Sequence, residues 1–337
     1  MCAIAAFASG CGSEEDGSVE NGMQALQNAD YVTAQKCFDE AVASGDRLKD
    51  AYRGRGMTYL ALADYAKAIE AFNLALCESN GIIDNTDIDI SYYYAIAQYK
   101  SGDLAGAIDT YNAIIDIAPA QDNAYYMRGK IKLLSGDKAG ADSDYRKAVE
   151  IAPKDYDHYL RICEDLKAEG YESEGEEYIK MAMSGGSKLS DYQKGVFEYY
   201  LGAYTDARND LEKAKSGKET EELVIYLGKT YEALGDFAYA LTIYETYLQK
   251  NPTSAQLYSE LALMKIEQQD YEGALQTAES GLALGSTPYM QSLMFSRIVA
   301  NEYLLNFDTA ASLMTEYLTM YPDDENARRE NEFLSTR

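Results

Sequence analysis

The sequence predicts an all-α solenoid, a chain of stacked helix pairs that has no single central core. Three observations support this fold class. One sequence neighbourhood, centred on a small residue such as Ala240, recurs along the chain with a period near 34 residues. Four of the five prolines fall at one place in that period. The 337 residues are also long for one compact core, and a period of this length is typical of repeat architectures.

The repeats are aligned on a reference position, which is alanine in eight of the nine units. In chain order its members are Ala34, Ala68, Ala107, Ala141, Glu174, Ala207, Ala240, Ala274 and Ala310. Successive steps along this series are 34, 39, 34, 33, 33, 33, 34 and 36 residues. The residue three places earlier is aromatic in seven of the nine units. The prolines in phase, twelve places later, are Pro119, Pro153, Pro252 and Pro322. The unit around Glu174 matches least well.

Each unit is predicted to fold as two helices, as the stretch from Gly228 to Pro252 illustrates. The first helix, of about 13 residues, is expected to end at Leu234, because Gly235 can adopt the left-handed backbone conformation that ends a helix. Asp236 can then cap the second helix, and Pro252 closes it because proline cannot continue the helical hydrogen bonds. Gly228 and Ala240 are small, so we expect the two helices to approach each other closely at these positions.

This pattern resembles the tetratricopeptide repeat family. The residues that carry the resemblance are the Gly or Ala at positions 22, 56, 95, 129, 195, 228 and 262, together with the reference, aromatic and proline series. The resemblance implies a right-handed superhelical solenoid of about nine helix-turn-helix repeats over residues 19–322. A polar segment, 323–337, is then expected to form a C-terminal capping helix. The aromatic residue early in each unit is tyrosine here, as at Tyr125, where the family often has tryptophan.

The N-terminus resembles a bacterial lipoprotein signal. Residues 1–10 are small and apolar, and they precede Cys11 in the sequence Ala8-Ser9-Gly10-Cys11. The resemblance implies removal of residues 1–10, lipidation of Cys11, a polar tether over 11–18 and an outward-facing anchor in the cell envelope. Two acyl chains suffice for stable anchoring. No Lys or Arg occurs before Lys36 and the apolar run is short, which a start codon assigned too far downstream would explain. The alternative is a cytoplasmic chain with an unmodified cysteine.

In the tetratricopeptide repeat family the first helix of each unit lines a concave groove. The position fifteen residues before the reference is expected to face that groove, and it reads Val19, Arg53, Tyr92, Tyr126, Tyr159, Tyr192, Ile225, Ser259 and Phe295. Tyr99 and Tyr199 lie eight residues before their references, and Lys130 completes the candidate binding residues.

The run of tyrosines suggests a hypothesis for the mode of binding. Packed helices lie about 8–10 Å apart, and a polyproline II peptide advances about 9 Å per turn, so one peptide side chain could meet each tyrosine. Residues 92–200 would then form a groove for an extended protein or peptide segment. The alternative is that tyrosine, of which the chain has 31, only fills the floor of the groove.

Composition excludes several classes of function. A formal net charge of −26 opposes nucleic-acid binding, which requires clustered Lys and Arg. The single His158 lacks a second histidine for a two-His metal site, and no CxxC motif occurs. We find no nucleophile motif or cofactor loop, so we predict a non-enzymatic scaffold without cofactor or metal. The alternatives are a cytoplasmic scaffold with the same groove and a surface lipoprotein that captures glycans by stacking tyrosine on sugars.

Overall fold

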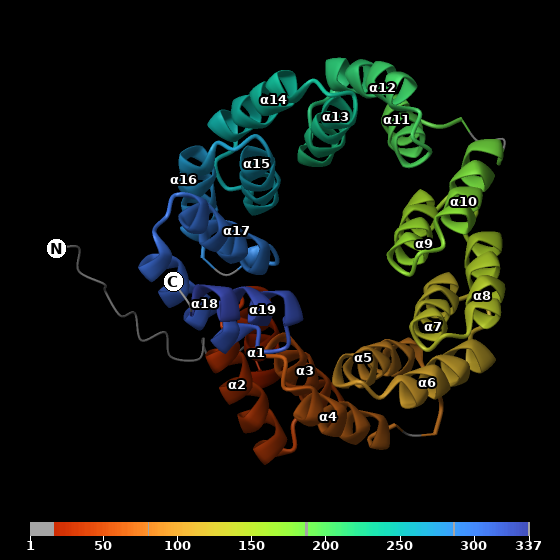
Figure 1. The fold of residues 1–337 in the computed structure, drawn as a ribbon. Coiled ribbons are helices and arrows are strands. Elements are labelled where there is room, and N and C mark those ends of the chain that lie inside the picture. The colour runs from red at the N-terminus through yellow and green to blue at the C-terminus, as the bar shows by residue number, and fades with distance from the viewer. Residues whose placement is uncertain (1–16, 80, 186–187, 286, 336–337) are drawn as a thin grey trace. The chain divides into compact units, whose positions relative to one another are not determined.

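The chain is entirely helical in the part that the computed structural model describes, residues 17–79, 81–185, 188–285 and 287–335. These residues form nineteen α-helices and no strand, which confirms the predicted fold class (Figure 1). The helices are α1 (Ser18–Gln27), α2 (Tyr31–Ser44), α3 (Leu48–Ala61), α4 (Tyr65–Cys77), α5 (Asn85–Ser101), α6 (Leu104–Ile117), α7 (Asp122–Leu134), α8 (Lys138–Ile151), α9 (Tyr156–Ala168), α10 (Glu172–Ser184), α11 (Asp191–Tyr200), α12 (Tyr204–Gly217), α13 (Glu221–Ala233), α14 (Phe237–Lys250), α15 (Ala255–Glu267), α16 (Tyr271–Leu282), α17 (Met290–Tyr303), α18 (Phe307–Met320) and α19 (Glu325–Leu334).

The helices pack in consecutive pairs within two compact units. The first unit contains α1–α10 and ends at Gly185, and the second contains α11–α19. Within each unit an odd-numbered helix packs against the even-numbered helix that follows it. Several odd-numbered helices also contact the next odd-numbered helix, as α7 contacts α9 and α11 contacts α13. The odd-numbered helices of each unit therefore form an inner layer, and the even-numbered helices form the outer layer (Figure 1).

The turn inside each helix pair follows the predicted chemistry. Gly235 has a φ angle of +80°, and the Asp236 side chain accepts a hydrogen bond of 3.2 Å from the backbone N–H of Tyr239. A positive φ recurs once in every unit, five residues before each of the eight reference alanines and at Gly170 in the fifth unit. These residues are Ala29, Ala63, Gly102, Gly136, Gly170, Gly202, Gly235, Gln269 and Leu305. The left-handed residue is thus a constant of the repeat, although four of its occupants are not glycine.

The reference position of the fifth unit was placed one residue too early. The eight reference alanines are fully buried, whereas the Glu174 side chain is 42% exposed and forms an ion pair with Lys138. Gly175 is buried instead, and a Cβ atom built on it would lie 2.9 Å from the backbone oxygen of Cys163. It also follows the left-handed Gly170 by five residues. Glutamate does not fit where two helices touch, so Gly175 occupies the contact.

Small residues bring the helices of a pair into contact, as predicted for the unit of α13 and α14. A Cβ atom on Gly228 would lie 2.1 Å from Cε1 of Tyr244, so only glycine fits there without displacing the ring. Tyr244 is fully buried, and its hydroxyl lies 3.2 Å from the backbone oxygen of Ile225 and 3.0 Å from Glu232. Ala240 is fully buried beside it.

Helix α19 closes the C-terminal end of the second unit against α18. The Asp324 side chain accepts a hydrogen bond of 3.0 Å from the backbone N–H of Ala327, which caps the helix. Ala327 and Leu334 are its buried residues, and the rest of the helix is mainly polar. None of the described helices combines the length and the apolar character that crossing a bilayer requires.

Candidate functional site

The predicted groove residues all lie on inner helices. They are Arg53 on α3, Tyr92 and Tyr99 on α5, Tyr126 and Lys130 on α7, Tyr159 on α9, Tyr192 and Tyr199 on α11, and Phe295 on α17. The first six belong to the first unit and the last three to the second. Cys11, the predicted lipidation site, lies outside the described residues.

The two basic residues of this set are bound within the chain. Arg53 donates to the carboxylate of Asp89 on the next inner helix, at 2.7 Å from Nε and 2.5 Å from a terminal nitrogen. Lys130 on α7 lies 2.5 Å from a carboxylate oxygen of Asp165 on α9. Both ion pairs join successive inner helices of the first unit. Their first role is therefore to tie neighbouring repeats together.

Tyr126 is a packed residue rather than an exposed anchor. Only 2% of it is exposed, and its hydroxyl donates a hydrogen bond of 2.8 Å to Asp165. Its ring stacks on His158 with centroids 5.4 Å apart, and the guanidinium of Arg161 lies 4.1 Å from the ring centroid. Burial, and then the negative charge of Asp165, raise the pKa of the Tyr126 phenol. The alternative that tyrosine fills the groove floor fits this position.

Tyr159 is also buried. It was included in the groove series because it lies fifteen residues before Glu174, the misplaced reference of the fifth unit. It is 5% exposed, and its hydroxyl lies 3.4 Å from the backbone oxygen of Pro153. With Gly175 as the reference, the residue fifteen places earlier is Leu160, which is partly exposed. The series therefore contains three equivalent tyrosines, not four in succession.

Tyr92 and Tyr99 on α5 remain partly exposed on the inner layer of the first unit. The ring of Tyr92 meets that of Tyr111 edge to face, with centroids 5.9 Å apart. Burial, and then Asp122, raise the pKa of Tyr92 to about 12. The Tyr92 phenol is therefore neutral at physiological pH.

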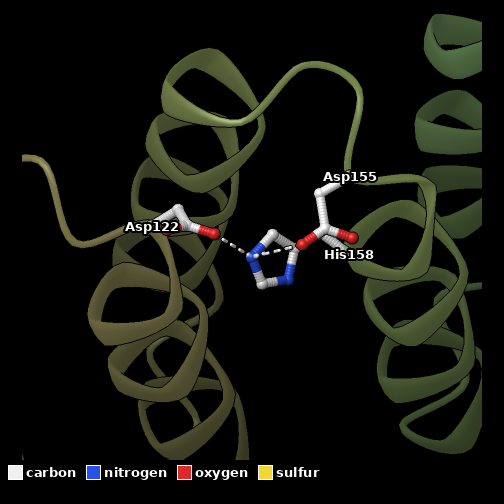
Figure 2. A group of neighbouring side chains, drawn as sticks. All are labelled: Asp122, Asp155 and His158. Carbon is white, nitrogen blue, oxygen red and sulfur yellow. Dashed lines mark hydrogen bonds and ion pairs between the residues drawn. The ribbon is translucent and has the colours of Figure 1, made fainter.

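Asp122, Asp155 and His158 form a group at the start of α7 and α9, which Figure 2 shows. Nε2 of His158 lies 2.7 Å from Asp122 and 3.7 Å from Asp155. The histidine is 2% exposed, whereas the Asp122 and Asp155 side chains are 31% and 43% exposed. The sequence did not reveal this group, because Asp122 and His158 are 36 residues apart and meet only when their repeats stack.

The donor atoms of this group lie within 4.8 Å of one another, close enough to surround a metal ion. Two features oppose a cation here. Asp122 and Asp155 sit at helix N-termini, where the helix dipole favours negative charge. Nδ1 of His158 is buried and has no hydrogen-bond partner among the described residues, whereas a metal-bound imidazole normally donates from its second nitrogen. We interpret the group as a structural hydrogen bond between α7 and α9.

The second unit presents five partly exposed tyrosines that contact one another. We call Tyr192, Tyr199, Tyr200, Tyr204 and Tyr226 the tyrosine cluster. Tyr226 on α13 lies 6.4 Å from Tyr192, 5.8 Å from Tyr199 and 6.1 Å from Tyr200, measured between ring centroids. Tyr204 at the start of α12 lies 5.7 Å from Tyr199. The cluster therefore bridges two successive inner helices and keeps ring surface accessible.

Sequence reasoning found only Tyr192 and Tyr199 of this cluster. The prediction used only the positions fifteen and eight residues before each reference. Tyr226 follows the first of these positions by one residue, and Tyr200 follows the second by one residue. Including every residue within one helical turn of these positions would have identified both tyrosines. The hydroxyl oxygens of Tyr200 and Tyr226 lie 3.2 Å apart, which confirms that the two side chains meet. Burial raises the pKa of Tyr199 to about 12, so this phenol is neutral at physiological pH.

Phe295 lies between two cavities of the second unit. One, of about 400 Å³, is bordered by Tyr289, Tyr317 and Asp324. The other, of about 420 Å³, lies between α17 and α19. Phe295 is partly exposed, so its ring contributes to the walls of both cavities.

The fold and the inner layer define a helical repeat protein. Family models of the tetratricopeptide repeat match residues 19–81, 89–122 and 227–288, and a second model of that repeat matches 122–155. Together they cover more than half of the chain. The chain therefore belongs to the tetratricopeptide repeat family.

Solved structures share the fold. A tetratricopeptide repeat protein from Parabacteroides merdae is 16% identical over 84% of this chain and 97% of its own, with a TM-score of 0.51. Yeast Tom70 is 15% identical over 96% of this chain and 82% of its own, with a TM-score of 0.57. Identities this low show similarity of fold alone. No curated protein matches the chain.

Proposed function

We propose that this chain is a non-catalytic scaffold that binds an extended segment of a partner protein at the tyrosine cluster. The observation that carries the proposal is the contact of partly exposed tyrosines across α11 and α13. Tyrosine is enriched at protein interfaces because it offers a large apolar ring and a hydroxyl at little entropic cost.

The geometry suits an extended segment that crosses the inner helices. Tyr192 and Tyr226 stand on successive inner helices, and packed helices are about 8–10 Å apart. A polyproline II segment repeats about every 9 Å, so its side chains could meet successive helices. A polyproline II segment forms no internal hydrogen bonds, so its backbone carbonyl groups can accept hydrogen bonds from phenol hydroxyls of the cluster.

The proposed binding surface differs from the groove predicted over residues 92–200. Tyr126 and Tyr159 are buried, so they can shape the inner layer but offer little ring surface to a ligand. Tyr92 and Tyr99 are partly exposed and form a smaller candidate surface in the first unit. We therefore assign the main binding role to the tyrosine cluster.

A direct test screens the purified chain against a library of extended peptides and a panel of oligosaccharides. The variant Tyr192→Ala/Tyr226→Ala removes two rings of the cluster. Tyr247→Ala, on the outer helix α14, is the matched control. We expect peptide binding that the double variant loses and the control retains. Oligosaccharide binding with the same dependence would favour the glycan-capturing alternative, and equal peptide binding by all three proteins would remove the tyrosine cluster from the mechanism.

We further propose that Cys11 carries a lipid anchor and that the scaffold faces outward from a bacterial envelope. The sequence Ala8-Ser9-Gly10-Cys11 supports this proposal. Mass spectrometry of protein isolated from its native cell tests it. We expect a chain that begins at a diacylated Cys11. A chain that retains residues 1–10 and a free Cys11 thiol would instead support the cytoplasmic alternative.

A further inference from the structure

A cavity of about 420 Å³ lies in the second unit between α17, the first residue of α18, and α19. We call it the C-terminal cavity. Four aromatic side chains border it, those of Phe295, Tyr303, Phe307 and Phe333. Two carboxylates, those of Glu302 and Glu330, also border it. The cavity thus combines aromatic surface with concentrated negative charge.

Helical spacing brings these side chains together. Phe295 and Glu302 are seven residues apart on α17, so they lie on one face two turns from each other. Glu330 and Phe333 are three residues apart on α19 and share the face that borders the cavity. The cavity therefore exists only because α19 packs at the end of the last repeat.

The described lining of the cavity does not balance the negative charge of its two carboxylates. Oε1 of Glu302 is buried and accepts no hydrogen bond from the described residues. No basic side chain is among the described residues that line the cavity. Burial, and then the neighbouring Glu330, raise the pKa of Glu302 to about 7. Burial and the neighbouring carboxylate of Glu330 disfavour the ionised form of Glu302, so a positively charged ligand would stabilise that form.

The rim of the cavity is apolar and accessible. Tyr303 is 59% exposed, Phe333 is 41% exposed and Leu305 is 73% exposed. Leu305 occupies the left-handed position of its repeat with a φ angle of +63°, where five other units have glycine. An exposed leucine in a backbone conformation that disfavours it is not explained by packing. A ligand that covers the rim would bury this apolar surface.

We propose that the C-terminal cavity binds an alkylammonium group, the chemistry that a lysine side chain and a small free amine share. The carboxylates of Glu302 and Glu330 would bind the charge, and the aromatic faces would add cation–π attraction. A calcium ion is a poorer fit, because it takes six to eight oxygen ligands and the described lining offers only two carboxylates. This site does not depend on whether the tyrosine cluster binds a partner.

The test measures binding of defined ligands to the purified full chain by calorimetry at pH 8, where Glu302 is mainly ionised. Nα-acetyl-lysine methylamide, which keeps the side-chain ammonium, represents a protein side chain, and butylammonium represents a free amine. N-acetyl-norleucine methylamide is the neutral control for the first. Glu302→Gln and Glu330→Gln remove the charges singly, and Glu332→Gln, an exposed residue of the same helix, is the matched control.

We expect at least one ammonium ligand to bind. Glu302→Gln and Glu330→Gln should each weaken its binding about tenfold or more, and Glu332→Gln should not. Tighter binding of the lysine derivative would identify a protein side chain as the source, and tighter binding of butylammonium a free amine. The proposal is overturned if neither ligand binds, if the neutral control binds equally well, or if Glu302→Gln and Glu330→Gln, folded by circular dichroism, bind like the wild type.

Discussion

The hydroxyl of Tyr126 donates a hydrogen bond of 2.8 Å to the carboxylate of Asp165, one repeat further along the chain. Lys130 binds the same carboxylate. Together they join α7 to α9, so an inner-layer tyrosine that was expected to hold a ligand instead holds two repeats together.

Tyr126→Phe should lower the free energy of unfolding by about 1.5 kcal/mol, because it removes a hydrogen bond to a charged group. Tyr126→Ala should cost about 3–5 kcal/mol, as loss of a buried aromatic ring does. Calorimetric or urea-induced unfolding measures both. Tyr125→Phe, next to it and partly exposed, should change stability by less than about 0.5 kcal/mol. Equal effects of the two Phe variants would show that the Asp165 contact contributes nothing.

Gly228→Ala should destabilise the chain by about 1–3 kcal/mol, because the new methyl group would lie 2.1 Å from the Tyr244 ring unless the helices separate. Gly217→Ala is the control, since a Cβ atom there meets nothing within 4 Å. Alanine favours a helix over glycine, so this variant should be unchanged or more stable by about 0.5 kcal/mol. Thermal unfolding distinguishes the two. A neutral Gly228→Ala would mean that α13 and α14 are not in close contact.

Ala63→Gly and Gln269→Gly should each stabilise the chain by about 1 kcal/mol. Both residues have positive φ angles, +58° and +61°, which glycine adopts without the steric cost that other residues carry. Gly235→Ala, at the equivalent position, should cost about 1–2 kcal/mol. The midpoint of urea unfolding measures all three variants. Destabilisation by the glycine substitutions would show that these turns are not left-handed.

Glu302 should make stability depend on pH in a predictable direction. Its pKa in the folded chain is raised to about 7, above about 4.3 for an unperturbed glutamate, so the folded state binds the proton more tightly. The stabilisation is fully present below about pH 4.3 and is lost as pH rises through about 7. Relative to wild type, Glu302→Gln should therefore gain stability between pH 5 and pH 8. Denaturant unfolding at both values measures this, and an unchanged difference would contradict it.

Local sequence patterns predicted the fold because the residues that define each repeat lie close together in the sequence. The left-handed residue, the aspartate cap and the small contact residue lie within a dozen residues of one another, as Gly228, Gly235 and Asp236 do. Their recurrence predicted where the helices of each pair begin and end. The fifth unit was misplaced by one residue because Gly175 follows a glutamate and no alanine marks the contact.

The candidate site was less predictable, because it depends on how one repeat is rotated against the next. Periodicity placed Tyr126 on the inner layer but could not show that Asp165 and Arg161 from α9 would engage it. Position counting likewise missed Tyr226, whose role follows from contacts with α11. The raised pKa of Glu302 could not be predicted from the sequence, because it depends on burial and on Glu330, which α19 places beside it.

Site-specific photocrosslinking in the native cell tests most directly whether the inner layer of the second unit binds a partner. A photoreactive amino acid replaces Tyr192 in the tyrosine cluster, and a matched variant carries it at the exposed Thr246 of the outer helix α14. We predict one dominant protein adduct at position 192 that is absent at 246 and disappears when Tyr226→Ala is added. No adduct at 192, or the same adducts at both positions, would contradict binding at the tyrosine cluster.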